Sequence, residues 1–424
     1  MYNLVSLAGV FILMLVAWAL STKRRAVNWR VVIGGVLIQM VFAIFVFVIP
    51  VGARFFLFLN DVVLKVLESA TAGSRFVFGR LALPPGASDE LGQGSLGFIL
   101  AFQALPTIIF FSSLMALLYH LRVLPWLVMQ FSRIFTRLMR ISGAESLCAA
   151  SNIFVGVESA TTVRPYLERM TRSELCTVLS VGMASIASNV MALYVFILQG
   201  QFPTIAGHLI SASVLSAPAA VVMSKLMVPE TGEPVTLGKD VEPFFEKSSS
   251  AMTSIIRGAN DGVRLIVGIA ALLIAVLGIV ALIDMALGWV FGLSLTVILG
   301  YVFYPFALVI GVPPSDAMEV ARLIGERVVA TEVKSYQRLA VLMADGTLEH
   351  SRSAFLSAYA LSGFAHFASL AIFVGGISSL VPSRTEDLTS LGFRALVAAT
   401  LACLMTASVA GVFFSESSIL LGGL

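Results

Sequence analysis

GMASIAS at Gly182–Ser188 and GFAHFAS at Gly363–Ser369 share the pattern G-x-A-x-x-A-S, and each copy lies inside a long apolar segment. Small residues let helices approach closely in lipid, which accounts for the Gly and Ala positions. Close packing does not account for the polar Ser185, Asn189 and His366 in the middle of these segments. Paired apolar segments with polar interruptions at corresponding positions indicate the binding site of a transporter. The repeat therefore predicts a transporter built from two related halves.

The composition places the chain in a membrane. Of its 424 residues, 58% are hydrophobic and 12% are charged, whereas soluble domains carry about 25% charged residues. The net charge of +3 comes from Lys and Arg in short connections, so we expect no nucleic-acid partner. The chain has no H-E-x-x-H, G-x-S-x-G or P-loop motif, and we expect no enzyme and no bound cofactor.

Apolar segments of about 20 residues predict an all-α polytopic membrane protein. We expect eight transmembrane helices, at 3–20, 31–50, 97–119, 174–198, 206–224, 262–286, 355–380 and 393–415. Basic residues follow the first segment and none precede it, which predicts that both termini lie outside. A basic amphipathic helix around Arg133, Arg137 and Arg140 should lie in the inner membrane interface. The polar stretch 225–247 should form an inner loop.

Two further apolar stretches, 145–165 and 295–320, are too interrupted by polar residues and prolines to cross simply. Each precedes one copy of the repeat, and each contains a Gly-Val pair, at 156 and at 311. Irregular backbone at membrane depth survives only where protein or a water-filled cavity satisfies it. We therefore expect two opposed re-entrant hairpins, an inverted repeat, and interrupted helices in spans four and seven.

Two acidic residues near these hairpins are candidates for recognition. Glu158 at the first hairpin tip could accept hydrogen bonds from a substrate or pair with a cation, or it could form a salt bridge with Arg164. Glu332 could bind substrate, or it could be a solvated helix residue paired with Arg327 or Lys334. The residues alone leave these alternatives open.

Oxygen ligands of low charge suit a monovalent cation such as sodium. An unwound helix exposes backbone carbonyls, and nearby Ser and Asn side chains add to them. Asn152, Val155, Ser185 and Ile186 could supply such a group.

Several motifs along the chain resemble the concentrative nucleoside transporter family, of the bacterial eight-span type. They are GSRFVFG at 73–79, FQALPTIIFF at 102–111, SNIFVG at 151–156, VRPY at 163–166, SAP at 216–218, KLMVPET at 225–231 and GFAHFAS at 363–369. Their order matches the family over almost the full length of the chain.

The resemblance implies a homotrimer in the bacterial inner membrane, with multi-pass chains and periplasmic termini. It implies a scaffold at 1–140 and a first transport-domain repeat at 141–235, with hairpin one and spans four and five. Residues 236–290 would be a cytoplasmic loop and scaffold span six, and 291–424 a second repeat with hairpin two and spans seven and eight. The transport domain would move like an elevator.

The resemblance also assigns residues. Sodium would bind at Asn152, Val155, Ser185 and Ile186, whose residue types match those of sodium-coupled relatives. Glu332 and Ser369 match the ribose-binding residues. Together, the residues expected to bind substrate are Val157, Glu158, Ser159, Val190, Glu332, Phe364, His366 and Ser369.

Two departures from the family pattern concern the substrate. The first hairpin tip reads Gly156-Val157-Glu158-Ser159, without the glutamine that reads the nucleobase, and His366 stands where the family has asparagine. We therefore expect a sodium-coupled symporter importing nucleosides. The alternative is a cation- or proton-coupled transporter of the same fold for a nucleobase or another polar metabolite.

Overall fold

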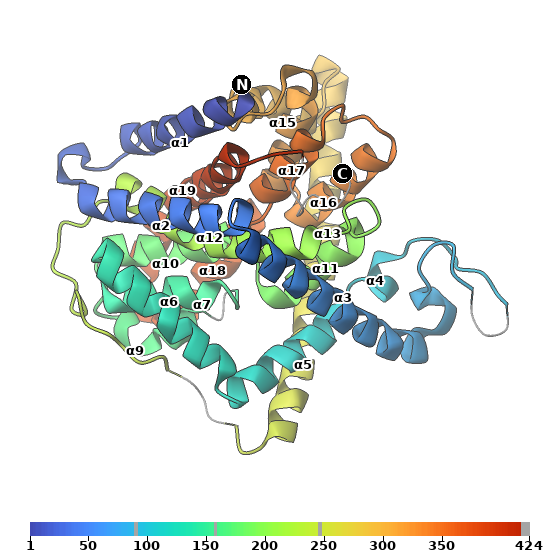
Figure 1. Ribbon diagram of the computed structural model, residues 1–424, viewed down its shortest axis with the longest axis horizontal. Coiled ribbons are helices and arrows are strands. Elements are labelled where there is room, and N and C mark those ends of the chain that lie inside the picture. The colour runs from blue at the N-terminus through green and yellow to red at the C-terminus, as the bar shows by residue number, and fades with distance from the viewer. Residues whose placement is uncertain (89–91, 157–158, 245–247, 417–424) are drawn as a thin grey trace.

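The computed structural model describes residues 1–88, 92–156, 159–244 and 248–416 as a helical bundle (Figure 1). The first half contains α1 (Tyr2–Ala19), α2 (Trp29–Phe47), α3 (Pro50–Phe78), α4 (Leu100–Gln103), α5 (Thr107–His120), α6 (Val123–Met139), α7 (Gly143–Asn152), α8 (Ser159–Thr162), α9 (Arg164–Leu167), α10 (Arg172–Ala184), α11 (Ser188–Leu198) and α12 (Ile205–Met227). The second half contains α13 (Ala251–Phe291), α14 (Leu295–Val309), α15 (Pro314–Val329), α16 (Glu332–Ala344), α17 (Ser351–Ala360), α18 (Phe367–Leu380) and α19 (Thr385–Val412).

Within these residues, seven helical segments are long and apolar enough to cross a membrane. They agree with expected spans one to six and eight. The expected span at 355–380 is divided between α17 and α18, as expected of an interrupted helix, and neither part is long enough alone. Of the crossing segments, α12 is 89% buried in the protein, whereas only 11% of the most apolar part of α13 is buried. The α13 helix packs mainly against α5 and exposes apolar side chains such as Trp289.

Both copies of the repeat interrupt a helix, as expected. The first break separates α10 from α11 at 185–187, and the second separates α17 from α18 at 361–366. The two breaks touch each other. A Cβ atom on Gly363 would lie 2.7 Å from the carbonyl oxygen of Ala184, and one on Gly182 would overlap the ring of Phe373. Gly363 therefore lets the second break pack against the end of α10, and Gly182 lets α18 pack against α10.

The helical hairpin before the second break lies later in the chain than the stretch 295–320. It consists of α15 and α16, which turn at Ala330 and Thr331. The Ser335 hydroxyl donates to the carbonyl of Leu323 at 3.1 Å, and Arg338 pairs with Glu319, so the two helices run antiparallel. Glu332 thus begins the second arm of this hairpin.

Gly311 is therefore not a hairpin tip but the junction between α14 and α15, with φ of +92°. The matching junction between α6 and α7 is Arg140, also at positive φ, +54°. The Gly-Val pair shared by the two broken stretches thus occupies different places in the two halves.

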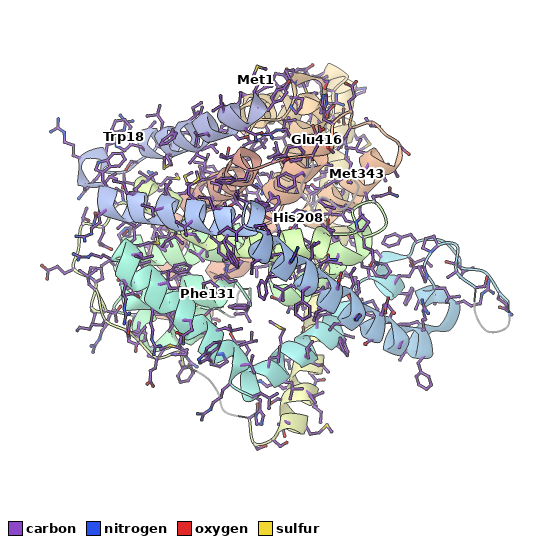
Figure 2. All side chains as sticks on the ribbon, in the orientation of Figure 1. Met1, Trp18, Phe131, His208, Met343 and Glu416 are labelled. Atoms are coloured by element: carbon purple, nitrogen blue, oxygen red, sulfur yellow. The ribbon has the colours of Figure 1, made fainter. Side chains whose placement is uncertain are left out.

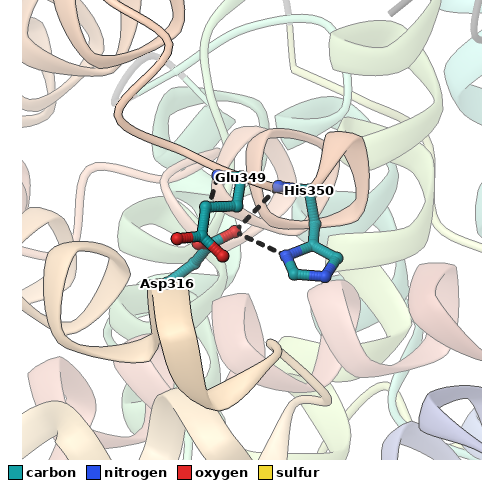
Figure 3. Close-up of side chains that lie close together, drawn as sticks. All are labelled: Asp316, Glu349 and His350. Carbon is teal, nitrogen blue, oxygen red and sulfur yellow. Dashed lines mark hydrogen bonds and ion pairs between the residues drawn. The ribbon is translucent and has the colours of Figure 1, made fainter.

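Asp316 fixes the base of the second hairpin (Figure 3). This buried carboxylate accepts backbone N–H groups from Glu349 at 3.2 Å and His350 at 3.1 Å, and the His350 ring lies 3.4 Å away. The segment before α17 is therefore held against the start of α15. Since these donors occupy both carboxylate oxygens, Asp316 serves to join α15 to the segment before α17.

The halves also meet in an aromatic cluster around His208, whose position is labelled in Figure 2. The His208 ring on α12 lies 2.9 Å through Nδ1 from the hydroxyl of Tyr359 on α17, and it packs edge-on against Phe355. Cys148, Cys176 and Cys403 are free and buried.

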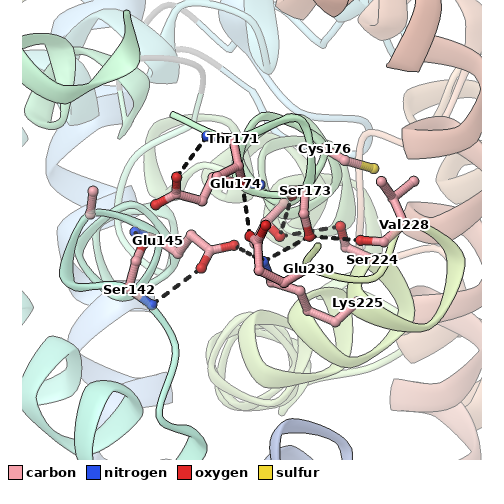
Figure 4. A network of polar contacts seen from close by, with 12 residues as sticks. Ser142, Glu145, Thr171, Ser173, Glu174, Cys176, Ser224, Lys225, Val228 and Glu230 are labelled. Atoms are coloured by element: carbon pink, nitrogen blue, oxygen red, sulfur yellow. Dashed lines mark hydrogen bonds and ion pairs between the residues drawn. The ribbon is translucent and has the colours of Figure 1, made fainter. Parts of the chain in front are cut away.

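Lys225 belongs to the core rather than to an inner loop, because α12 continues to Met227. Its ammonium lies 2.5 Å from Glu145 on α7 and 3.4 Å from Glu230, and it donates to Ser173 on α10 at 2.9 Å (Figure 4). Its side chain is only 6% exposed. The sequence prediction of a loop from 225 is wrong here, because buried carboxylates allow the cation to lie within a helix.

Candidate substrate and ion site

Glu332 is the centre of a buried polar group formed by three helices. The hydroxyl of Tyr194 on α11 donates to Glu332 Oε1 at 2.6 Å, and Nε2 of His366, just before α18, lies 3.0 Å from Oε2. Glu332 and His366 are each 3% exposed. A solvated Glu332 is therefore excluded.

The two basic residues expected as alternative partners of Glu332 lie elsewhere. Lys334 pairs with Glu326 at 3.3 Å, and Arg327 donates to the carbonyl of Ala360 at 2.6 Å. The carboxylate of Glu332 is therefore held by a phenol and an imidazole, both of which a substrate hydroxyl could replace or join.

The helix start at α18 sets the orientation of the His366 ring. Nδ1 accepts the backbone N–H of Ser369 at 3.1 Å, in the manner of an N-cap. Nδ1 must therefore lack a proton, so a neutral ring carries its proton on Nε2, toward Glu332. Ser369 completes the cap, because its hydroxyl oxygen accepts the backbone N–H of His366 at 3.3 Å. The same hydroxyl also contacts the carbonyls of His366 and Phe364.

Apolar residues flank this group. The half-buried Phe364 ring lies 6.4 Å from that of His366, and Val190 lies one helical turn before Tyr194 on α11. Sequence reasoning missed Tyr194. The available signal was its place on the same face of α11 as Val190, since residues four apart share a face.

The residues expected at the first hairpin tip divide into two groups. Val157 and Glu158 lie outside the described residues. Ser159 is buried, and its hydroxyl donates to Oδ1 of Asn152 at 3.1 Å, so it contacts the expected sodium ligands rather than Glu332.

Asn152 and Ser185 join α7 to the break between α10 and α11. The Ser185 hydroxyl donates to the Asn152 carbonyl at 3.0 Å, and the Asn152 amide contacts the Ser185 oxygen and donates to the Val181 carbonyl at 2.6 Å. No donor among the described residues bonds to the carbonyls of Val155 or Ile186. These neutral oxygens fit a sodium ion, which prefers hard oxygen ligands.

A positively charged side chain, that of Arg327, lies beside the break between α17 and α18. Arg327 is fully buried at the end of α15, and its guanidinium bonds to Ala360, the last residue of α17. A helix C-terminus carries partial negative charge that a cation stabilises. In the first half, the neutral Asn152 donates to the corresponding end of α10.

Comparisons with known proteins agree with this architecture. Models of the Na+ dependent nucleoside transporter N-terminus and C-terminus match residues 8–81 and 208–411, and a nucleoside recognition "gate" model matches 101–201. The chain is 34% identical to the nucleoside permease NupC of Helicobacter pylori, over 97% of this chain and 98% of that protein. It is 36% identical to solute carrier family 28 member 3 of Eptatretus stoutii, where it spans only 60% of the relative's length.

Solved structures of CNTnw share the fold. In an inward-facing substrate-bound state, CNTnw is 36% identical with a TM-score of 0.89, covering 97% of this chain and 99% of the other. A variant of CNTnw in an outward-facing state has a TM-score of 0.87 at 35% identity, covering 97% of this chain and 98% of the other. These relatives are transporters and not enzymes, in agreement with the absence of catalytic motifs. The chain is a multi-pass membrane protein that belongs to the concentrative nucleoside transporter family.

Proposed function

We propose that this protein is a sodium-coupled symporter that imports nucleosides across the bacterial inner membrane. The observation that carries the proposal is the buried group of Glu332, Tyr194 and His366, placed where a hairpin arm and a broken helix meet. A buried carboxylate that accepts hydrogen bonds suits the paired hydroxyls of a ribose. The ring of Phe364 and the side chain of Val190 offer apolar surface beside it.

Sodium binding at Asn152, Val155, Ser185 and Ile186 would hold the first hairpin against the first break. The break of α10 and the break of α17 are in contact, so ordering one supports the other. By linkage, sodium and substrate must then raise each other's affinity by the same factor.

The function is tested by uptake into proteoliposomes containing the purified full-length chain. An inward sodium gradient should drive accumulation of radiolabelled uridine or adenosine, and equal potassium should not. Failure of every nucleoside to accumulate or to compete, while sodium alone raises the melting temperature, would overturn the nucleoside assignment.

Ser185→Ala should weaken sodium binding more than it weakens folding. The substitution removes one proposed ion ligand, and a hydrogen bond contributes about 1 kcal/mol, so we expect roughly a fivefold to tenfold rise in the sodium concentration for half-maximal uptake. The matched control is Ser188→Ala, three residues along at the start of α11. An unchanged sodium dependence in Ser185→Ala would place the ion elsewhere.

A second candidate function rests on His366, which replaces the amide found in the family. Imidazole offers one donor and one acceptor, whereas an amide offers two donors and an acceptor. Here the acceptor Nδ1 is used by Ser369, which leaves a single donor toward the site. This arrangement favours a substrate with fewer acceptors than a ribonucleoside, such as a nucleobase or another polar metabolite.

His366→Asn should shift selectivity toward ribonucleosides. One changed hydrogen bond in a buried site alters affinity by about 1–3 kcal/mol, so relative inhibition constants should change by roughly fivefold to a hundredfold. Competition between unlabelled nucleosides, deoxynucleosides and nucleobases measures this ratio. Unchanged ratios of inhibition constants in parent and variant would mean that His366 does not read the substrate.

Transport by an elevator-like movement and assembly as a homotrimer form part of the same proposal. Structures of CNTnw in inward-facing and outward-facing states support alternating access for this fold. The exposed apolar side of α13 supports a subunit interface along that helix. The basic residues near positions 23–30 and 133–140 support a cytoplasmic placement for the end of the molecule that carries them. The two termini would then be periplasmic.

A further inference from the structure

A cavity of about 1000 Å³ lies at the basic end of the molecule, away from Glu332. Its walls come from the start of α2, the end of α6, the start of α7, the end of α12 and the segment that follows α12. The cavity therefore lies between two groups of helices that are far apart in sequence.

The basic side chains of this cavity differ in whether they have partners. Lys225 is matched by Glu145 and Glu230, which also line the cavity. The other three, Arg30, Arg137 and Arg140, have no ion pair or side-chain hydrogen bond within the part of the chain that the structure describes.

The lining carries four cationic side chains and three carboxylates, and the third carboxylate, Asp240, does not pair with Arg30, Arg137 or Arg140. Asp240 lies 3.9 Å from Arg133 on the outer face of α6. Three unpaired guanidinium groups around one hollow repel one another unless an anion joins them. Guanidinium binds phosphate oxygens in bidentate fashion, so a phosphate fits this charge arrangement.

The backbone at Arg140 is a further indication. Its φ of +54° is a left-handed conformation that favours glycine, which is the residue at the corresponding junction in the second half, Gly311. An arginine is present here despite that preference, and its side chain lines the cavity.

Apolar side chains extend from the mouth of the cavity. On α6, Ile134 is 43% and Leu138 is 58% exposed, and both line a second hollow that shares Arg137 with the first. At the start of α2, Trp29 and Ile33 are also exposed. A ligand that carries hydrocarbon as well as phosphate would contact both kinds of surface.

We propose that this cavity binds the phosphate headgroup of an anionic phospholipid, held by Arg30, Arg137 and Arg140, with its acyl chains along Ile134 and Leu138. Basic pockets between helices at a cytoplasmic surface recognise such headgroups. The lipid would contact α2 and α6 on one side and α7 and α12 on the other, so its occupancy would depend on how these helices are arranged. The proposal is independent of the transported substrate.

The test titrates lipid into the full-length protein in a nonionic detergent and measures the melting temperature. Phosphatidylglycerol should raise the melting temperature in a saturable way, and phosphatidylcholine with the same chains should not. Because each interfacial arginine changes affinity for anionic lipid roughly fivefold, the half-saturating concentration should rise about thirtyfold in the Arg137→Gln/Arg140→Gln variant.

The control variant is Arg54→Gln, which changes an exposed arginine on the amphipathic helix α3 that also lacks a described ion pair. It should respond to phosphatidylglycerol as the parent does. Equal responses to both lipids, or an unchanged half-saturation in the double variant, would overturn the proposal. An equal rise with inorganic phosphate alone, lost in the double variant, would assign the cavity to a free anion instead.

Discussion

Glu332→Gln should reduce the affinity for a transported nucleoside by roughly tenfold to a hundredfold. Glu332 accepts a hydrogen bond from Tyr194 at 2.6 Å and lies 3.0 Å from the His366 ring, in a site with almost no exposure. Hydrogen bonds to a charged group contribute about 1.5–3 kcal/mol, and an amide loses both that charge and one acceptor. Binding of labelled nucleoside to the purified protein measures the loss directly.

Two further variants locate the cause of this effect. Tyr194→Phe keeps the carboxylate and removes one donor, so it should alter affinity less than Glu332→Gln does. Glu319→Gln changes a glutamate on the other arm of the same hairpin, where it pairs with Arg322 and Arg338, and should leave affinity unchanged. If Glu332→Gln bound nucleoside as tightly as the parent, the proposed ribose site would be wrong.

Lys225→Met should destabilise the protein by about 3–5 kcal/mol, because it leaves buried carboxylates without their cation. Glu145 has a 1% exposed side chain and lies 2.5 Å from the ammonium, which is its only ion-pair partner among the described residues. The same ammonium joins α7, α10 and α12, whose packing carries the first hairpin. Thermal unfolding in detergent, followed by intrinsic fluorescence, measures the change.

The double variant Lys225→Met/Glu145→Gln separates loss of charge balance from loss of packing. The amide can still accept the backbone N–H of Ser142, which Glu145 now does at 3.2 Å, and it no longer carries a buried charge. Most of the lost stability should therefore return. A double variant less stable than Lys225→Met alone would show that the charge is not the cause.

The sequence predicted the broken helices well because their signal is local. Small residues and mid-span polar residues are read directly from a few neighbouring positions, and both interruptions lie at the repeat. The residues alone leave the role of Glu332 open, and only the family resemblance assigns Glu332 and His366 to one substrate site. Its buried partner Tyr194 is remote in sequence, and nothing near position 332 indicates it.

The errors had a common physical origin, which is dependence on distant partners. A Gly-Val pair is too short to identify equivalent positions, so the second hairpin was placed one helix too early. The polar stretch after Lys225 predicts a loop, because nothing near Lys225 indicates its carboxylate partner Glu145, 80 residues earlier in the chain. The tip residues Val157 and Glu158 remain predictions.

The close contact at Gly363 should couple the binding of sodium to the binding of substrate. Its lack of a side chain puts the break of α17 in van der Waals contact with the carbonyl of Ala184, at the break of α10. Closely packed interiors transmit small displacements rather than absorb them. The affinity measured for either ligand should therefore change with the concentration of the other ligand. The absence of a side chain at position 363 would thereby couple occupancy of the sodium site to occupancy of the substrate site.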